Sequence, residues 1–479
     1  MGILDLLPPT FWDRIRPPTR ISRDLIFGLL FGITFSLSST SLALLTQSWR
    51  RRRAIARIPP RPIELRSDEI VAGVIGLIGN TPLVRIGSLS DALGVEILGK
   101  AEFLNPGGSV KDRIALRIIE DAESQGLLHP HTGSVLFEGT VGSTGISLAT
   151  VGRAKGYDTV IVMPDDVAID KVQILEKLGA KVERVRPASI VDEKQFVNLA
   201  RRRAEQFGQT TLVTPPQRGD DIVVTTQATT SEVSHTLLPL SFPPSPSSSP
   251  SSSSSSSSSL HILPDVLEKK PRGFFADQFE NDSNWRAHYD GTGPEILRQT
   301  GGHLDAFVSG AGTGGTITGV GKYLKNHLNG IQIILADPQG SGLFNKVRYN
   351  VMYDHKESEG TKRRHQVDTI VEGIGINRIT HNLQLGLKVI DDAYRISDLE
   401  ALAMSRWLVK YDGMFLGSSS ACNLVACVKV AKKLGRGKRV VTILCDSGSR
   451  HQNKFWSEKY LRENNLKVDI SLIEKLIAS

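Results

Sequence analysis

Short, mostly apolar runs alternate with helical stretches along this chain from about Ile70 onward. Residues 135–137 and 159–163 have the length and composition of buried strands, and a helical stretch follows each of them. Residues 171–179 and 181–185 repeat the same helix–strand unit. Strands that are connected through helices pair in parallel, because the crossover returns the chain to the same end of the sheet. The sequence therefore predicts an α/β fold in which mostly parallel sheets are wrapped by helices.

A turn rich in Gly and Pro, residues 105–113, runs directly into a helical stretch. Ser109, followed three residues later by Asp112, resembles a capping box, and the apolar residues behind it recur at helical spacing. Lys111 therefore falls in the first helical turn, where the positive end of the helix dipole disfavours a protonated amine. If it is also removed from water, Lys111 is a candidate for Schiff-base chemistry. The alternative is a solvated lysine at a helix start.

A glycine-rich segment, Gly310–Thr316, follows the apolar strand 306–308 and opens another helix. Backbone N–H groups at such a helix start bind phosphate well. Three of its glycines, with Asp337 at the end of the next strand, also fit the spacing of a dinucleotide-binding fingerprint. A tight turn without a ligand is the third alternative.

Residues 138–145 form another strand-to-helix loop. Its N–H groups and the hydroxyls of Thr140 and Thr144 can receive a carboxylate at the helix N-terminus. The alternative is a helix start that binds nothing.

Together these segments resemble the fold-type II pyridoxal-phosphate enzymes, the cysteine synthase and cystathionine β-synthase family, and most closely its membrane-anchored mitochondrial fungal type. The resemblance runs from about Ile70 to Arg450 with one interruption. It includes Ser447, which follows the apolar strand 440–445. A dehydrogenase has no use for the Lys111 turn, whereas a pyridoxal-phosphate enzyme needs both this turn and the glycine-rich segment. The pyridoxal-phosphate interpretation is therefore preferred.

The resemblance implies two lobes with the cofactor in the cleft between them, and it implies a role for individual residues. Lys111 is the implied catalytic residue, and Val141 and Ser143 depart from the Ser and Asn that are usual at their positions. The implied cofactor-binding residues are Lys111, Ser143, Gly312, Thr313, Gly314, Gly315, Thr316 and Ser447. The implied substrate-binding residues are Thr140, Gly142, Thr144 and Gln278, and no metal is implied. The histidines lack ligand-like spacing and are assigned to the surface or to packing.

The implied reaction is a β-replacement in which a homodimeric enzyme forms L-cysteine and acetate from O-acetylserine and sulfide. Cystathionine formation from serine and homocysteine is the nearest alternative, and we expect it less because only 32 residues follow Ser447, too few for a C-terminal regulatory domain. Serine or threonine dehydration uses the same residues. A membrane-tethered inactive homologue is an alternative of another class, supported by Val141 and Ser143.

The N-terminal segment 1–66 contains eleven Arg and no Lys. Within it, residues 25–46 form a run without a charged side chain that is long enough to span a membrane. We expect a single transmembrane helix here and, because the segment is rich in Arg and poor in acidic residues, a location in the mitochondrion, at its outer membrane. A cleaved matrix-targeting peptide is the alternative.

The net charge of +8 arises almost entirely in this segment, where arginines exceed acidic residues by 11 − 4 = 7, so we expect no nucleic-acid partner. Three cysteines are too few for a disulfide framework. A Pro/Ser-rich stretch that includes the serine run 241–259 predicts a disordered insertion. The predicted domains are the N-terminal segment 1–66, an N-terminal α/β lobe 67–213, the insertion 214–272 and a C-terminal α/β lobe 273–479.

Overall fold

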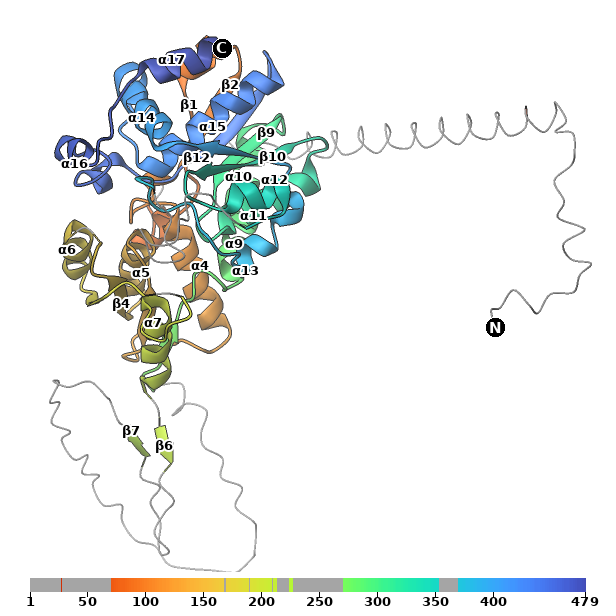
Figure 1. Cartoon of the computed structure of the whole chain (residues 1–479). Coiled ribbons are helices and arrows are strands. Elements are labelled where there is room, and N and C mark those ends of the chain that lie inside the picture. The colour runs from red at the N-terminus through yellow and green to blue at the C-terminus, as the bar shows by residue number, and fades with distance from the viewer. Residues whose placement is uncertain are drawn as a thin grey trace, which may run out of the picture. The chain divides into compact units, whose positions relative to one another are not determined.

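The computed structural model describes residues 70–352 and 369–479, except 168, 189, 209, 213–223 and 227–269, and also Phe27. The described residues from 70 onward belong to one compact unit. Two main β-sheets with helices packed over them build this unit (Figure 1). This arrangement agrees with the expected two-lobed α/β fold.

The larger sheet has the strand order β1-β2-β12-β9-β10-β11. Its strands are parallel except β1, which pairs antiparallel with β2. The strands are β1 (Leu83–Arg85), β2 (Glu96–Ala101), β12 (Arg439–Leu444), β9 (Ala306–Gly310), β10 (Gln332–Pro338) and β11 (Asp392–Ile396).

The smaller sheet has the order β5-β4-β3-β8, and all of its strands are parallel. They are β5 (Lys181–Val185), β4 (Asp158–Pro164), β3 (Val135–Gly139) and β8 (Gly273–Phe275). β8 follows the predicted insertion in sequence but pairs with β3, whereas β1 and β2 precede the insertion and belong to the larger sheet. Each sheet therefore combines segments from both sides of the insertion.

Both faces of the larger sheet are buried, which explains why its strands are continuous apolar runs. Along β9, Ala306 and Val308 pack into one core and Phe307 into another, because successive side chains of a strand point to opposite faces. Helices α14 (Asp398–Asp412) and α15 (Ser418–Leu434) cover the first face, and α11 (Gly315–His327) and α12 (Leu343–Tyr349) cover the second. The tight packing on both faces fixes the positions of the loops at the strand ends.

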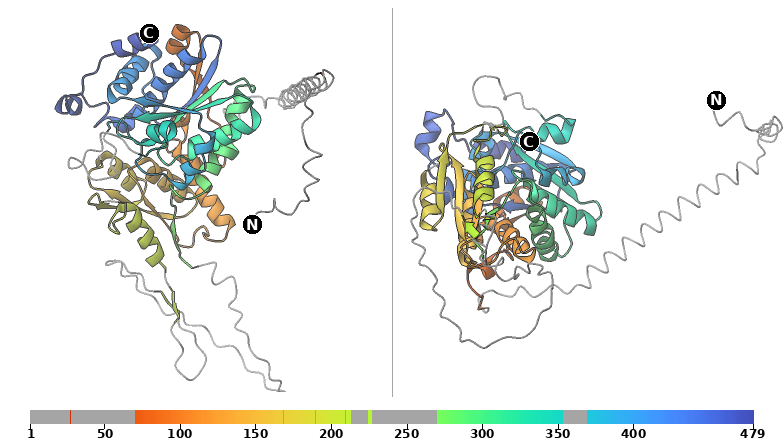
Figure 2. Two further views of the ribbon diagram at one scale, coloured as in Figure 1. Left: turned by 45° about the vertical axis from the view of Figure 1, so that its right-hand side comes forward. Right: turned by 90° about the horizontal axis from the view of Figure 1, so that it is seen from below.

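Most helices occupy the connections between strands, while η3 precedes β1 and η7, α16 and α17 follow β12 (Figure 2). The α-helices are α3 (Gly87–Leu93), α4 (Lys111–Ser124), α5 (Ser143–Ala154), α6 (Ile169–Lys177), α7 (Phe196–Gln206), α9 (Ser283–Ala287), α10 (Gly293–Gln299), α11 (Gly315–His327), α12 (Leu343–Tyr349), α13 (His381–Gln384), α14 (Asp398–Asp412), α15 (Ser418–Leu434), α16 (Glu458–Glu463) and α17 (Ser471–Ala478). The shorter helical turns are η3 (Val74–Leu77), η4 (Glu102–Leu104), η5 (His288–Thr292), η6 (Leu387–Val389) and η7 (Gly448–His451).

The transmembrane helix that the fold prediction included needs correction. Within the described residues no helix is long and apolar enough to cross a membrane. The longest of them, α15, has 17 residues, and at about 1.5 Å per residue it falls short of the roughly 30 Å of a hydrocarbon core. The run 25–46 lies outside the described residues apart from Phe27. We therefore remove the transmembrane helix, and the membrane attachment that depended on it, from the account.

The segment predicted to be a disordered insertion contains one short strand, β7 (Val224–Thr226), which pairs antiparallel with β6 (Thr210–Leu212). The serine run 241–259 lies outside the described residues. Its disorder, and the domain limits drawn around it, stay predictions.

Candidate active site

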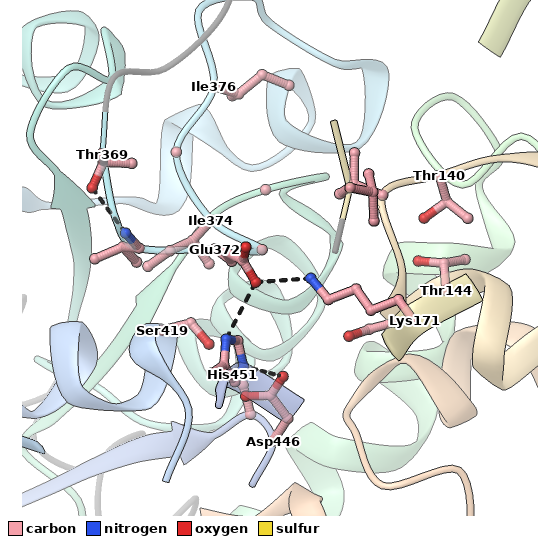
Figure 3. A pocket seen from close by; sticks show the side chains of 18 of the residues that line it. Thr140, Thr144, Lys171, Thr369, Glu372, Ile374, Ile376, Ser419, Asp446 and His451 are labelled. Carbon is pink, nitrogen blue, oxygen red and sulfur yellow. Dashed lines mark hydrogen bonds and ion pairs between the residues drawn. The ribbon is translucent and has the colours of Figure 1, made fainter. Parts of the chain in front are cut away.

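The segments singled out in the sequence come together because each of them follows the C-terminal end of a parallel strand. β2 leads to the Lys111 turn, β9 to the glycine-rich segment and β12 to Asp446, all in the larger sheet, and β3 leads to the loop 138–145 in the smaller sheet. Ligands of open parallel sheets bind at these ends. The loops surround a cavity of about 1210 Å³ (Figure 3).

Most of the residues predicted to act at a site line this one cavity. They are Lys111, Thr140, Ser143, Thr144, Gln278, Gly312, Thr313, Gly314 and Thr316. Gly142, Gly315 and Ser447 are not among the lining residues, although each is a neighbour of the lining loops in the chain.

Lys111 is the first residue of α4, in agreement with the predicted helix start, and its side chain lines the cavity. Within the described part of the chain its ammonium group has neither a hydrogen bond nor an ion pair. Burial lowers the pKa of Lys111 from its ordinary value, because a charged amine loses its hydration there. The neutral form of the amine is therefore more populated than it is for a lysine in water. A neutral amine can act as a nucleophile or a base.

Asp112 closes the turn before α4. Its carboxylate accepts hydrogen bonds from the backbone N–H of Gly107 (2.5 Å) and from the hydroxyl of Ser147 in α5 (2.5 Å). A Cβ atom at Gly107 would overlap this carboxylate, so the turn needs glycine there. Burial raises the pKa of Asp112 to about 6, although both hydrogen bonds act in the opposite direction. The Lys111 turn is thus tied to the helix that begins at the loop 138–145.

A buried ion-pair network, which no local sequence pattern predicts, fixes the other side of the turn. Arg113 lies 2.7 Å from Glu102, at the end of β2, and 2.7 Å from Glu295 in α10. Lys100 in β2 completes the network, 2.6 Å from Glu295. Burial would raise the pKa of both carboxyl groups, but the facing cations lower them. These pairs therefore stay charged and hold β2, α4 and α10 in one arrangement.

The glycine-rich segment forms a close-fitting start to α11. Gly314 has φ +83°, a conformation that favours glycine. A Cβ atom at Gly312 would overlap the carbonyl oxygen of Gly373, and one at Gly315 would overlap the side chain of Asn284. The first N–H groups of a helix have no partner within it, so this start offers donors to a phosphate.

Two threonines add hydroxyl groups to this helix start. The hydroxyl of Thr313 accepts a hydrogen bond from Asn284 (2.9 Å), which leaves its own proton for a ligand. The hydroxyl of Thr316 lies 3.2 Å from Nε2 of His288. Burial lowers the pKa of His288 to about 3, so its ring is neutral.

The loop 138–145 is connected to β8 through a buried chain of polar groups. The hydroxyl of Thr144 donates to Gln278 (2.5 Å), and the amide of Gln278 donates to Glu138 (3.1 Å). Burial, together with the charge of Asp277, raises the pKa of Glu138 to about 8. Glu138 is therefore largely protonated at neutral pH, and Thr144 and Gln278 are held in fixed orientations.

The middle of the loop is open to the cavity. Gly142 has φ +149°, and its N–H donates to the hydroxyl of Thr140 (3.3 Å). Val141 is 48% exposed, so an apolar side chain faces the space where the resemblance expects a hydroxyl. The hydroxyl of Ser143 accepts a long hydrogen bond from Arg450 (3.5 Å). The N-terminus of α5 and the threonine hydroxyls here suit a carboxylate.

Ser447 follows β12 as expected, but its hydroxyl makes local contacts. It accepts a hydrogen bond from the N–H of Ser449 (3.3 Å) and lies 3.0 Å from the hydroxyl of the same residue. A contact between Ser447 and a cofactor ring stays a prediction.

Sequence reasoning missed a row of charged side chains across the cavity (Figure 3). Lys171 in α6 pairs with Glu372 (2.8 Å), Glu372 with Nδ1 of His451 (3.3 Å), and Nε2 of His451 with Asp446 (3.0 Å). His451 is buried, in agreement with an assignment to packing, but it is also charged. Burial would lower the pKa of His451, and the two carboxylates raise it to about 9. A carboxylate five residues before the histidine is the only local signal in the sequence.

The geometry defines a class of protein: a two-sheet α/β protein in which a lysine, without a hydrogen bond or ion pair among the described residues, lines one cavity together with the N-terminal ends of two helices. A model of the family described as "Pyridoxal-phosphate dependent enzyme" matches residues 74–237 and 251–446. The chain therefore belongs to this family.

Several relatives share most of their length with this chain. Cysteine synthase 2 of Emericella nidulans is 54% identical over 81% of this chain and 80% of its own length. Cysteine synthase 2 of Schizosaccharomyces pombe is 50% identical over 83% of this chain and 87% of its own length. A Saccharomyces cerevisiae protein, provisionally named a mitochondrial cysteine synthase, is 46% identical over 87% of this chain and 88% of its own length.

Solved structures show the same architecture. An O-acetylserine dependent cystathionine β-synthase from Helicobacter pylori has a TM-score of 0.58 at 26% identity, over 81% of this chain and 98% of its own. An O-ureido-L-serine synthase has a TM-score of 0.59 at 25% identity, over 85% of this chain and 100% of its own.

Pyridoxal 5'-phosphate is the cofactor of this family, and the residues present fit it. The backbone at Gly312 and Gly315 packs so closely on its neighbours that a Cβ atom would overlap them, and the donors at the start of α11 suit a phosphate. Lys111 lines the same cavity, and its amine would be available to the cofactor's aldehyde. The dinucleotide interpretation leaves this lysine without a role.

Proposed function

We propose that this protein is a cysteine synthase that forms L-cysteine and acetate from O-acetylserine and sulfide. The observation that carries the proposal is the amine of Lys111, which has no partner within the described residues and lines a cavity between two helix N-termini. Support comes from the relatives named cysteine synthase, at 46–54% identity over most of the chain. Both structural neighbours carry the names of enzymes that use or make a modified serine.

The carboxylate of the substrate binds at the N-terminus of α5 in this proposal. Thr140 and Thr144 line the cavity there, and Gln278 faces the same space. The hydrogen bond from Thr144 to Gln278, together with that from Gln278 to Glu138, fixes these groups before the substrate arrives. A pre-ordered site spends less binding free energy on ordering its own side chains.

Lys111 moves the proton in this mechanism. The bound cofactor supplies an electron sink for the negative charge that forms at the substrate's α-carbon. The neutral amine of Lys111 removes the α-proton, since its lowered pKa favours the form that accepts a proton. The bond to the acetate oxygen then breaks, a bond from sulfur to the β-carbon forms, and the protonated amine of Lys111 returns its proton to the α-carbon. We expect Gly312–Thr316 to hold the phosphate, and Ser143 and Ser447 to contact the ring.

The experiment is an assay of the purified protein with O-acetylserine and either sulfide or homocysteine. We expect cysteine and acetate in equal amounts with sulfide, and a much lower rate with homocysteine. Faster formation of cystathionine would assign the protein to the other branch of the family. No product with either nucleophile, from a protein that carries the cofactor, would contradict the proposal. Light scattering on the same sample tests the expected homodimer.

We also propose a mitochondrial location. It is supported by the Arg-rich, acid-poor segment 1–66 and by the name of the Saccharomyces cerevisiae relative. A fluorescent protein fused behind residues 1–66 should co-localise with a mitochondrial marker. Diffuse fluorescence would contradict this location.

A further inference from the structure

The charged side chains across the cavity form a connected series that joins both sheets. We call it the charged chain, and it consists of Lys171, Glu372, His451 and Asp446. Lys171 belongs to α6, which packs on the smaller sheet, whereas Asp446 directly follows Cys445 at the end of β12 in the larger sheet. Figure 3 shows the pairs end to end across the cavity. Lys171, at one end, packs over the loop 138–145, and Asp446, at the other end, lies in the loop that follows β12.

At one end the charged chain contacts the loop that we assign to the substrate carboxylate. A Cβ atom at Gly142 would lie 2.8 Å from Cδ of Lys171, so the lysine stem packs directly over this loop. Gly142 has φ +149°, a conformation that glycine adopts readily and other residues rarely do, so the lysine stem packs over backbone that carries no side chain. The ion pair with Glu372 determines where the lysine stem lies.

In the middle, the charged chain contacts the phosphate-binding segment. Glu372 precedes Gly373, whose carbonyl oxygen packs so closely on Gly312 that a side chain has no space there. The backbone N–H of Glu372 donates to the hydroxyl of Ser418 at the start of α15 (2.9 Å). The position of Glu372 is therefore linked to the phosphate-binding segment by main-chain contacts.

At the other end, Asp446 is fixed from two sides. Its backbone carbonyl accepts the N–H of Gly417 (3.0 Å), and a Cβ atom at Gly417 would overlap the Asp446 carboxylate. Its side chain forms a hydrogen bond with Nε2 of His451 (3.0 Å), and the Glu372 carboxylate lies 3.3 Å from Nδ1 as an ion pair. Two carboxylates at opposite nitrogens of the ring restrict its orientation.

We propose that the charged chain positions the carboxylate-binding loop relative to the cofactor-binding loops, and that Lys171 and His451 are positioning residues for the reaction. The inference rests on the proposed function in assigning the loop 138–145 to the substrate carboxylate. Positive and negative groups alternate along the charged chain: Lys171 and His451 are positive, and Glu372 and Asp446 are negative. Each group is therefore held by its neighbours. Lys454 adds a further cation 3.7 Å from Glu372.

The first test measures the position of the loop without measuring activity. Hydrogen exchange of the peptides that cover residues 140–147 is compared, in the purified cofactor-loaded protein, between wild type, Lys171→Met, Glu372→Gln and the double variant. We expect exchange about tenfold faster in each single variant, and no further increase in the double variant, because both remove the same link. Exchange equal to wild type in both single variants would overturn the proposal. So would effects that add in full.

A matched control and a rescue accompany these variants. Lys325→Met removes an exposed lysine from its ion pair with Asp391, away from the cavity, and should leave exchange in 140–147 unchanged. Lys171→Arg keeps the charge and should restore most of the protection. Faster exchange in the control, or none of the protection regained by arginine, would assign the effect to general destabilisation.

The second test uses the titration of His451, whose ring is faced by Asp446 and Glu372, with Lys171 and Lys454 on the far side of Glu372. Since its pKa is raised to about 9, the ring is charged below this pH and neutral above it. At pH 7, His451→Gln should therefore exchange faster than wild type in residues 140–147, and at pH 10 the two proteins should be alike. A ratio that stays the same at both pH values would contradict the role of His451.

Kinetics separate this inference from the proposed function. We expect the KM for O-acetylserine to rise about tenfold in Lys171→Met, which corresponds to about 1.4 kcal/mol, while kcat and the cofactor absorbance change little. A loss of kcat with unchanged KM would contradict a positioning role. A wild-type protein that makes no cysteine would refute the proposed function, and the exchange experiments would still decide whether the charged chain holds the loop.

Discussion

Replacement of Arg113 by methionine should destabilise the protein strongly. The guanidinium group pairs with Glu102 (2.7 Å) and with Glu295 (2.7 Å). Lys100 can still pair with Glu295 in the variant, but Glu102 is fully buried and keeps only hydrogen bonds from Thr81 and Asn105. Removing one partner of a buried ion pair costs about 3–5 kcal/mol, because the other charge stays buried and unpaired.

Urea unfolding of Arg113→Met and wild type measures this loss. We expect a lower midpoint with an unchanged slope, and a difference of at least about 3 kcal/mol in the free energy of unfolding. The matched control is Lys438→Met, which removes one side of the exposed pair with Asp305 and should cost less than about 1 kcal/mol. A loss for Arg113→Met as small as that of the control would refute the argument.

The pH dependence follows from the direction of the Glu102 shift. The pKa of Glu102 is lowered in the folded protein. Its contribution to stability is therefore present above its pKa in the unfolded chain, about 4.3, and is lost as pH falls through its pKa in the folded protein. The difference between Arg113→Met and wild type should therefore be largest in mildly alkaline solution, where Glu102 is charged in both proteins. It should shrink as pH falls, because protonation removes the unpaired charge of the variant, and a difference that grew in acid would contradict the assignment.

Three further outcomes are expected. Glu138→Gln should become more stable relative to wild type as pH rises from about 5 to 8, because the pKa of Glu138 in the folded protein is raised to about 8 and burying its charged form costs free energy. Denaturant unfolding at several pH values checks this, and a stability difference that does not depend on pH contradicts it. The double change Val141→Ser with Ser143→Asn should raise kcat/KM for O-acetylserine about tenfold through an added hydrogen bond, and an unchanged value would mean that the loop serves another substrate. Gly315→Ala should weaken binding of pyridoxal phosphate, since its methyl group would overlap Asn284; wild-type affinity in a cofactor titration would show that the cradle is loose.

Local sequence patterns predicted the strands and the helix start at Lys111 because those features depend on neighbouring residues. The apolar runs 135–137 and 159–163 lie within β3 and β4, and Lys111 begins α4. Each pattern needs only a short stretch of chain, since helix starts and buried strands are set by local spacing and composition. The resemblance to a family then supplied the roles of the individual residues, which spacing alone does not define.

Contacts between distant segments could not be predicted in this way. β8 pairs with β3 through residues that are 138 positions apart in sequence, from Val135↔Gly273 to Phe137↔Phe275, and nothing local selects that partner. Likewise, Glu295 gives no sign in the sequence that it faces Arg113. His451 appeared to be a surface or packing residue, because its charge depends on two carboxylates brought to it by the fold. The transmembrane helix was expected from the lack of charge in the run 25–46 alone, and no membrane-spanning helix occurs among the described residues, which include only Phe27 of that run.

The central claim is that Lys111 carries pyridoxal phosphate in a cysteine-forming enzyme. The most direct measurement is reduction of the purified protein with borohydride, followed by protease digestion and mass spectrometry. Borohydride fixes the linkage between cofactor and lysine, so the added mass marks the lysine concerned. We predict that the peptide containing Lys111 carries the cofactor mass, and that prior addition of O-acetylserine lowers the yield of this adduct. An adduct on another lysine, such as Lys100 or Lys171, or no adduct from a protein that forms cysteine, would contradict the account.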